Sequence, residues 1–182
     1  MWVAVFAKGT LRHHPGLLLR QVIDRRGHVT SRWKRLYDQS APGLPTSTSA
    51  NIRRGQAAMA HVILHRETAA NAMHRHDLGW IDFVWGTTGA PAKGSGKRKG
   101  AKGVAHILEA RQRKDGLPLV KAKDLAMKLP QVIAMGQRET TTGQQASNVR
   151  IAFAGHVAVL VANPKTGHWL LTGWKESPDG HP

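Results

Sequence analysis

The last third of the chain alternates between apolar and polar residues in a way that predicts β-strands. Alternating runs cover residues 148–153, 156–162 and 168–174. Ala154-Gly155 separates the first two runs, and Asn163-Pro164-Lys165-Thr166-Gly167 separates the last two; both sequences are typical of turns. This region therefore predicts a meander of antiparallel strands.

The middle of the chain carries a helical pattern. Apolar spacing predicts a helix over residues 57–64 that continues weakly to residue 73, and a second over residues 104–114. A third begins near residue 122 and is broken or kinked by Pro130 before it stops at Gly136. A strand bounded by glycines is expected at residues 79–86. Helices followed by a meander indicate an α+β fold, with N-terminal helices packed on one face of an antiparallel β-sheet and the other face open for a ligand.

Residues 1–50 follow neither pattern clearly. They are basic, a strand is expected at residues 28–36, and residues 39–50 have the Ser/Thr/Pro-rich composition of a linker. We therefore expect a basic N-terminal extension and linker over residues 1–50 and a folded domain over residues 51–182. The extension has two interpretations, a mobile basic arm and a solvated, partly disordered tail.

The charge of the chain indicates which classes of partner it can bind. It has 27 Lys and Arg against 11 Asp and Glu, a formal net charge of +16, which is typical of proteins that bind nucleic acid, an anionic membrane surface or an acidic partner. The absence of cysteine excludes disulfides, thiolate metal sites and a cysteine nucleophile. No apolar run is long enough to span a membrane, and the first residues lack the layout of a signal peptide. We therefore expect no membrane partner, and a location in the cytoplasm or delivery to a host cytoplasm by phage or conjugative machinery.

His106 is the main candidate for site chemistry. It lies in the first turn of the helix expected at residues 104–114, directly after a Gly/Lys-rich loop at residues 86–103. Histidine titrates near neutral pH. The helix dipole and nearby cations disfavour its imidazolium form, which suits a general base. The alternative is a histidine that only caps the helix or makes a local hydrogen bond.

Other polar residues are weaker candidates for a catalytic or binding site. His13-His14 and His74-Arg75-His76 lack the partners at helical spacing that zinc needs, so no metal site is expected. The loop at residues 86–103 is either a clamp on a phosphate backbone or an ordinary solvated loop. Its glycine spacing does not match the known nucleotide-binding motifs, so no nucleotide cofactor is expected. Asp82 is better explained as a structural acid, held by a hydrogen bond or an arginine, than as a catalytic one.

Four sequence blocks follow one another between about residues 72 and 174. They read N-A-M-x-R-x-D-L-G-W-I-D-F-V-W-G, G-x-x-H-I-x-E-x-R, L-P-x-V-I-x-x-G and W-L-L-T-G-W. Their order and spacing resemble the phage- and polyvalent-protein-associated members of the barnase–EndoU–colicin–RelE (BECR) nuclease superfamily. The likeness covers a little over half of the chain and excludes residues 1–50. It implies a small α+β RNase of barnase-like fold that needs no metal ion.

The resemblance also suggests residues for the site. His106 matches the family histidine by position, and Thr172 matches the threonine of the closing strand. Where many relatives carry a tyrosine, this chain has Trp174, which can stack on a base but cannot donate a hydroxyl proton. Arg150 is expected to clamp a phosphate from its place on the sheet. The catalytic candidates are therefore His106, Arg150 and Thr172, and the substrate-binding candidates are Lys102, Arg111, Arg113, Trp174 and Lys175.

Together these features predict a metal-independent endoribonuclease that cuts RNA by transesterification through the 2′-hydroxyl and is associated with a toxin, a phage or another mobile element. The expected partners are RNA, single-stranded or tRNA-like, and an immunity or antitoxin protein. A non-catalytic, basic nucleic-acid-binding protein and a phage structural protein on the same fold are the alternatives. A binding protein would hold DNA and RNA alike, with a steep dependence on salt and no product.

Overall fold

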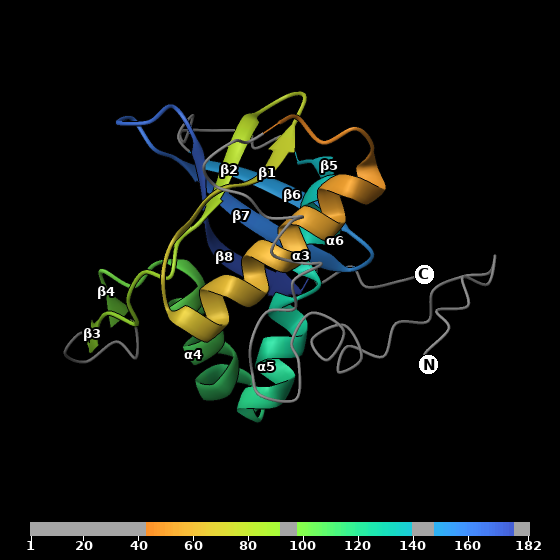
Figure 1. Cartoon of the computed structure of the whole chain (residues 1–182). Coiled ribbons are helices and arrows are strands. Elements are labelled where there is room, and N and C mark those ends of the chain that lie inside the picture. Colours follow the sequence, from red (N-terminus) through yellow and green to blue (C-terminus); the bar gives the residue numbers. More distant parts are fainter. Residues whose placement is uncertain (1–42, 92–97, 140–147, 177–182) are drawn as a thin grey trace.

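The computed structural model describes residues 43–91, 98–139 and 148–176; the side chains of residues 174–176 lie outside this description. Four helices are present in it: α3 (Thr48–His65), α4 (Gly103–Asp115), α5 (Leu119–Ala126) and α6 (Leu129–Met135). The main sheet consists of β1 (Ala69–Arg75), β2 (Gly79–Phe83), β5 (Gln137–Arg138), β6 (Asn148–Phe153), β7 (His156–Ala162) and β8 (Trp169–Glu176). Two short strands, β3 (Ala90–Pro91) and β4 (Arg98–Lys99), form a separate pair that projects from the body (Figure 1).

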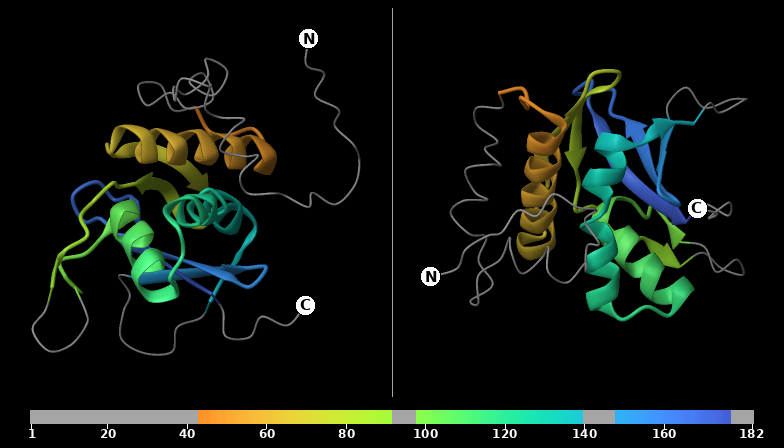
Figure 2. Two further views of the ribbon diagram at one scale, coloured as in Figure 1. Left: turned by 90° about the horizontal axis from the view of Figure 1, so that it is seen from below. Right: turned by 90° about the vertical axis from the view of Figure 1, so that its right-hand side faces the viewer.

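The main sheet has the strand order β1-β2-β8-β7-β6-β5. All neighbouring strands are antiparallel except β2 and β8, which are parallel. The sheet curls, so that β1–β2 and β6–β8 lie on two sides of the green and teal helices in the left panel of Figure 2. The α+β class and the C-terminal meander are thus confirmed, and the sheet is mixed rather than purely antiparallel.

The alanine-rich residues 69–73, predicted as a weak continuation of the first helix, form the strand β1 instead. Helix α3 ends at Arg66, which adopts a left-handed conformation while its N–H bonds to the carbonyl of Val62 at 3.0 Å. The following residues pair with β2, from Ala69 opposite Phe83 to Arg75 opposite Gly79. Alanine favours helices in isolation, but this preference is weak and pairing with a neighbouring strand overrides it.

The core lies between the helices and the inner face of the curled sheet. Gly55 sits where α3 crosses β1, and a side chain there would meet Met73 and Pro130. Helix α4 packs against β8, and α6 packs against β6 and β7. The largest fully buried side chains come from all of these layers: Phe83, Met59, Met73, Ile81, Met127, Leu129, Ile133, Ile151, Leu160, Leu171 and Val62.

The predicted break at Pro130 is confirmed, and it divides the helix into α5 and α6. Pro130 is the second residue of α6. Proline is tolerated there because the first turn of a helix does not need its N–H for an internal hydrogen bond. The end of α6 lies next to β1 and β6: its carbonyls at Ile133 and Gly136 accept hydrogen bonds from Arg75, and α6 packs against β6.

Helix α3 begins inside the stretch expected to be a linker. Ser47 caps α3, because its side-chain oxygen accepts the N–H of Ala50 at 3.1 Å. The strand expected at residues 28–36 and the rest of residues 1–42 lie outside the described residues. No helix within the described ranges has both the length and the apolar character needed to cross a membrane.

Candidate active site

The start of α4 is fixed to the chain that leaves β2. Gly103 has a positive φ of 73° and lies against the backbone of Val84 and Trp85. The N–H of Val104 bonds to the carbonyl of Val84 at 2.8 Å, and the N–H of Ala105 bonds to that of Trp85 at 2.9 Å. The first N–H groups of α4 are therefore used by the protein itself, and the next residue, His106, sits on a rigid element.

His106 is half-buried at this anchored start. Burial lowers the pKa of its imidazole; Glu109 counteracts this, and the cations Lys114, Arg113 and Arg111 add to the lowering. Its Nδ1 is buried and has no hydrogen-bond partner among the described residues. A lowered pKa keeps the ring neutral near pH 7, as predicted, although the main cause is burial rather than the surrounding charges. A neutral imidazole can accept a proton.

Glu109 lies one turn after His106 on α4, and it was not among the residues expected at the site. Its Oε1 is 2.8 Å from Nε of Arg113 and 3.7 Å from Nε of Arg98, while its Oε2 is buried without a partner in the described structure. Arg98 also bonds to the carbonyl of Thr88 at 2.8 Å, so Glu109 ties the β3–β4 region to α4. Residues three apart on a helix are neighbours, and the glutamate of the G-x-x-H-I-x-E-x-R block was the signal that could have identified it.

Thr172 lies on the strand against which α4 packs. The parallel register sets Asp82 opposite Leu170, and the chain that leaves β2 leads to Val84, whose carbonyl accepts the N–H of Val104 in α4. The pairing of β7 and β8 shifts at Thr172, whose hydroxyl donates a long, 3.4 Å hydrogen bond to the carbonyl of Val159. Helix α4 and the strand that carries Thr172 are therefore in direct contact.

Arg150 lies in the same row of the sheet, but it alternates with the buried Val149 and Ile151, so its side chain is on the opposite face from α6. It is paired with Val159, which is in turn opposite Gly173, so Arg150 is two strands, or about 10 Å, from the residue after Thr172. Its Nε lies 2.8 Å from Oε2 of Glu139, in a charge pair whose geometry does not form a hydrogen bond. A phosphate would have to compete with Glu139 for this guanidinium.

The predicted substrate-binding residues differ in exposure and in whether their charge is already paired. Arg111 is mostly buried and pairs with Asp115 at 2.7 Å, and Arg113 is held by Glu109. Both cations are thus partly neutralised. Lys102 is exposed, and its backbone forms two hydrogen bonds with Thr87. Trp174 and Lys175 belong to β8, but their side chains lie outside the described part of the structure.

Asp82 is held by hydrogen bonds, in agreement with the structural role expected for it. Only 6% exposed, it accepts the N–H of Asn71 at 2.8 Å and contacts Nδ1 of His168 at 3.0 and 3.1 Å. Asn71 has a positive φ of 52°, where the pairing of β1 with β2 is irregular. His168 could not be recognised as the partner from the sequence, because 86 residues separate it from Asp82. Within the described ranges, no three His, Cys, Asp or Glu side chains are grouped as a metal site.

Comparison with known families gives one match. Residues 72–179 match the sequence profile of the family described as phage-Barnase-EndoU-ColicinE5/D-RelE like nuclease 1. This range covers more than half of the chain and includes the end of β1, the strand β2, the helix α4 and the β6–β8 meander, while α3 precedes it. No curated protein and no solved structure matches the chain significantly. The chain therefore belongs to the phage-associated Barnase–EndoU–Colicin E5/D–RelE-like nuclease family.

Proposed function

We propose that this chain is an endoribonuclease that cuts RNA through the 2′-hydroxyl of the substrate and needs no metal ion for that step. The observation that carries the proposal is the position of His106, a half-buried imidazole with a lowered pKa at the anchored start of α4, beside β8, in a chain of a nuclease family. The cut requires a base for the 2′-hydroxyl, a proton for the leaving 5′-oxygen and donors for the charge on the phosphorane.

His106 is assigned the role of base. It takes the proton of the 2′-hydroxyl as the 2′-oxygen bonds to phosphorus, and the bond from phosphorus to the 5′-oxygen then breaks. The leaving oxygen receives its proton from water or from a neighbouring cation. The products are a 2′,3′-cyclic phosphate and a 5′-hydroxyl. Glu109 supports this role because its negative charge favours the imidazolium that forms during the transfer.

Arg150 and Thr172 are assigned to the phosphorane. The hydroxyl of Thr172 is engaged only in a 3.4 Å bond to a carbonyl, so its rotation towards a phosphate costs little. Arg150 can exchange the carboxylate of Glu139 for a phosphate, since both are anions that guanidinium binds well. Lys102, Arg111, Arg113, Trp174 and Lys175 are assigned to the flanking substrate.

The family and the charge support a proposal for the biological setting. A net charge of +16 suits an RNA substrate, single-stranded or tRNA-like, and it suits an acidic immunity or antitoxin protein that would block the site. We assign the chain to phage or other mobile elements, as a toxin-like nuclease that acts in a host cytoplasm.

The test is cleavage of end-labelled RNA in EDTA, compared with an all-2′-deoxy strand of the same sequence. The wild-type chain should cut only the RNA. His106→Ala should lower the rate by about 10²–10⁴, the usual contribution of a placed proton-transfer group, whereas His65→Ala, a change at an exposed histidine at the end of α3, should retain activity. Tight binding of both strands without a product would instead identify a nucleic-acid-binding or structural protein on a nuclease fold.

A further inference from the structure

A carboxylate and an imidazole form a pair on the face of the sheet that is turned away from the core. The pair consists of Asp82 on β2 and His168, which directly precedes β8. Asp82 lies between the core residues Ile81 and Phe83, so its side chain is on the opposite face of the sheet. Neither member of the pair is among the residues assigned to cleavage or to substrate binding.

Asp82 determines which nitrogen of His168 carries the proton. Nδ1 of His168 lies 3.0 and 3.1 Å from the two oxygens of Asp82, and carboxylate oxygens are acceptors. Nδ1 is therefore the donor, and in the neutral ring Nε2 has the lone pair and accepts a hydrogen bond. Nε2 is in no hydrogen bond or ion pair among the described residues, and the side chain is 26% exposed. The imidazole thus presents an acceptor to a ligand.

The negative charge of Asp82 is not presented to a ligand. Asp82 is only 6% exposed, and its Oδ1 also accepts the N–H of Asn71 at 2.8 Å. Both carboxylate oxygens are therefore used within the protein. A neutral group with an N–H fits the lone pair of Nε2, whereas a phosphate would meet an acceptor beside a buried carboxylate. The pair therefore favours an uncharged hydrogen-bond donor.

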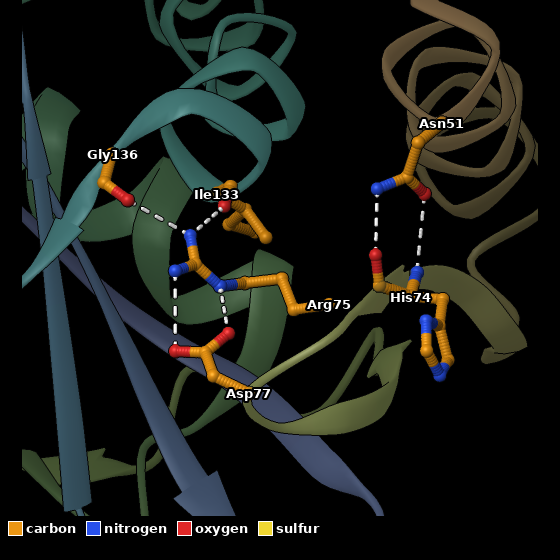
Figure 3. Close-up of polar contacts among 6 residues, drawn as sticks. All are labelled: Asn51, His74, Arg75, Asp77, Ile133 and Gly136. Carbon is orange, nitrogen blue, oxygen red and sulfur yellow. Dashed lines mark hydrogen bonds and ion pairs between the residues drawn. The ribbon is translucent and has the colours of Figure 1, made fainter. Parts of the chain in front are cut away.

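An indole ring lies close to this pair. Trp80 precedes Asp82 by two residues on β2, so both side chains are on one face, with their Cα atoms about 7 Å apart. The guanidinium of Arg54 lies over the indole, 5.6 Å from its centroid, and the ring of His74 meets it edge-on at 5.1 Å. The backbone of His74 is in turn held by Asn51 of α3, whose side chain donates to its carbonyl at 2.7 Å and accepts its N–H at 3.1 Å (Figure 3). The indole is thus held in place while it remains partly exposed, and an exposed indole can stack on a base.

The sheet register brings the indole and the imidazole together. Ile81 is paired with Trp169, so the residues before them, Trp80 and His168, lie next to each other on β2 and at the start of β8. A flat ring with an N–H at its edge could stack on Trp80 and donate to Nε2 of His168. Unpaired RNA bases are recognised in this way, by stacking and by hydrogen bonds at the Watson–Crick edge. Uracil at N3 and guanine at N1 have a ring N–H at that edge, whereas cytosine and adenine have an acceptor there.

We propose that Trp80 and His168 bind one base of the RNA substrate outside the cleavage site and select uracil or guanine, with Asp82 as the positioning residue. Trp80 stacks on the base, and Nε2 of His168 accepts the ring N–H. The proposal rests on the proposed function, because it names a base contact for the same substrate.

The base contact and the proposed phosphate clamp lie on one face of the sheet. Asp82 is opposite Leu170, Leu170 is opposite Val161, and Val161 is opposite Asn148, which precedes Arg150 by two residues. His168 and Arg150 are therefore two strands and four residues apart, or about 16 Å. About five stacked nucleotides, or fewer in an unstacked strand, span this distance. One single-stranded RNA can reach both places.

The test compares the binding of two fluorescent 2′-O-methyl oligomers, one of uridine and one of N3-methyluridine, neither of which can be cut through the 2′-oxygen. The N3-methyl group removes the N–H and leaves the ring available for stacking. The wild-type chain should bind the uridine oligomer up to about tenfold more tightly, the effect of one neutral hydrogen bond. His168→Ala should bind the two oligomers almost equally. His65→Ala, at an exposed histidine at the end of α3, is the control and should keep the wild-type ratio.

The role of Asp82 has its own readout. Asp82→Asn offers an amide N–H to Nδ1, so the proton is no longer confined to Nδ1 and the ratio between the two oligomers should fall. Nitrogen NMR of the His168 ring gives a measurement without any substitution. At a pH where the ring is neutral, Nδ1 should carry the proton, and the Nε2 signal should move with the uridine oligomer but not with the N3-methyluridine oligomer.

Equal affinity of the wild-type chain for the two oligomers, a ratio that His168→Ala leaves unchanged, or a proton on Nε2 in the free chain would overturn the proposal. Binding is measured without cleavage, so the two proposals can fail separately. A chain that shows the dependence on the uracil N–H but cuts no RNA would refute only the proposed activity. A chain that cuts RNA but binds both oligomers equally would refute only the base contact.

Discussion

The contact between α3 and β1 can be tested by Gly55→Ala. This substitution has two opposing effects on stability, a gain in helix propensity and a clash with the residues packed against Gly55. Gly55 is inside α3, where alanine instead of glycine normally stabilises a helix by about 0.5–1 kcal/mol. A Cβ at this position would lie 2.5 Å from Sδ of Met73 and 2.8 Å from Cβ of Pro130. Overpacking of this kind costs about 1–3 kcal/mol. The sulfur belongs to a flexible side chain and can move, but the proline ring cannot move without α6.

The clash should therefore win, with a net loss of about 1–1.5 kcal/mol in the free energy of unfolding, or roughly 3–6 °C in Tm. Urea unfolding followed by tryptophan fluorescence, together with a thermal scan by circular dichroism, measures both. Gly43→Ala is the control, since no atom lies within 4 Å of a Cβ there, and it should leave stability nearly unchanged. If Gly55→Ala were as stable as the wild type or more so, α3 would not pack on β1 as the structure has it.

Three further predictions concern the site. The lowered pKa of His106 should keep the base active below pH 6.5, and activity should be lost as the pH falls through that lowered pKa. Glu109→Gln removes the negative charge that raises the pKa of His106, so the acid limb of the kcat/KM profile should move to lower pH. An unmoved acid limb would contradict an electrostatic coupling between Glu109 and His106. Asp82→Asn replaces a buried, charged acceptor and should cost about 1–3 kcal/mol of unfolding free energy in urea, whereas a neutral result would show that its contacts do not stabilise the fold. Glu139→Gln removes the carboxylate paired with Arg150 and should tighten RNA binding. Arg150→Ala should weaken RNA binding and reduce the slope of log affinity against log salt concentration by about 1. Identical effects of the two changes would contradict a competition between Glu139 and phosphate for Arg150.

The features that could be predicted from the sequence depend on neighbouring residues. The alternation over residues 148–174 is local, and it predicted the three strands β6, β7 and β8 because one face of each has to be buried. The buried face of α4, with Val104, Ile107 and Leu108, follows from helical spacing in the same way. His106 could be selected for a similar reason, since its place in the first turn is visible in the chain itself.

The features that were missed depend on contacts between distant residues. The alanines at residues 69–73 carry no alternation that separates a strand from a helix, and only pairing with β2 decides the outcome. The parallel pairing of β2 with β8 and the contact of Asp82 with His168 join distant segments; Asp82 and His168 are 86 residues apart. The charge pair of Arg150 with Glu139 was also invisible, because the two residues meet only when β5 pairs with β6.

The chemical nature of the new RNA ends tests the central claim most directly. After incubation in EDTA, the fragments are analysed by mass spectrometry, and the cleavage proposed for His106 predicts a 2′,3′-cyclic phosphate on one fragment and a 5′-hydroxyl on the other. Fragments with a 3′-hydroxyl and a 5′-phosphate would contradict the account, because the 2′-hydroxyl would then not be the nucleophile.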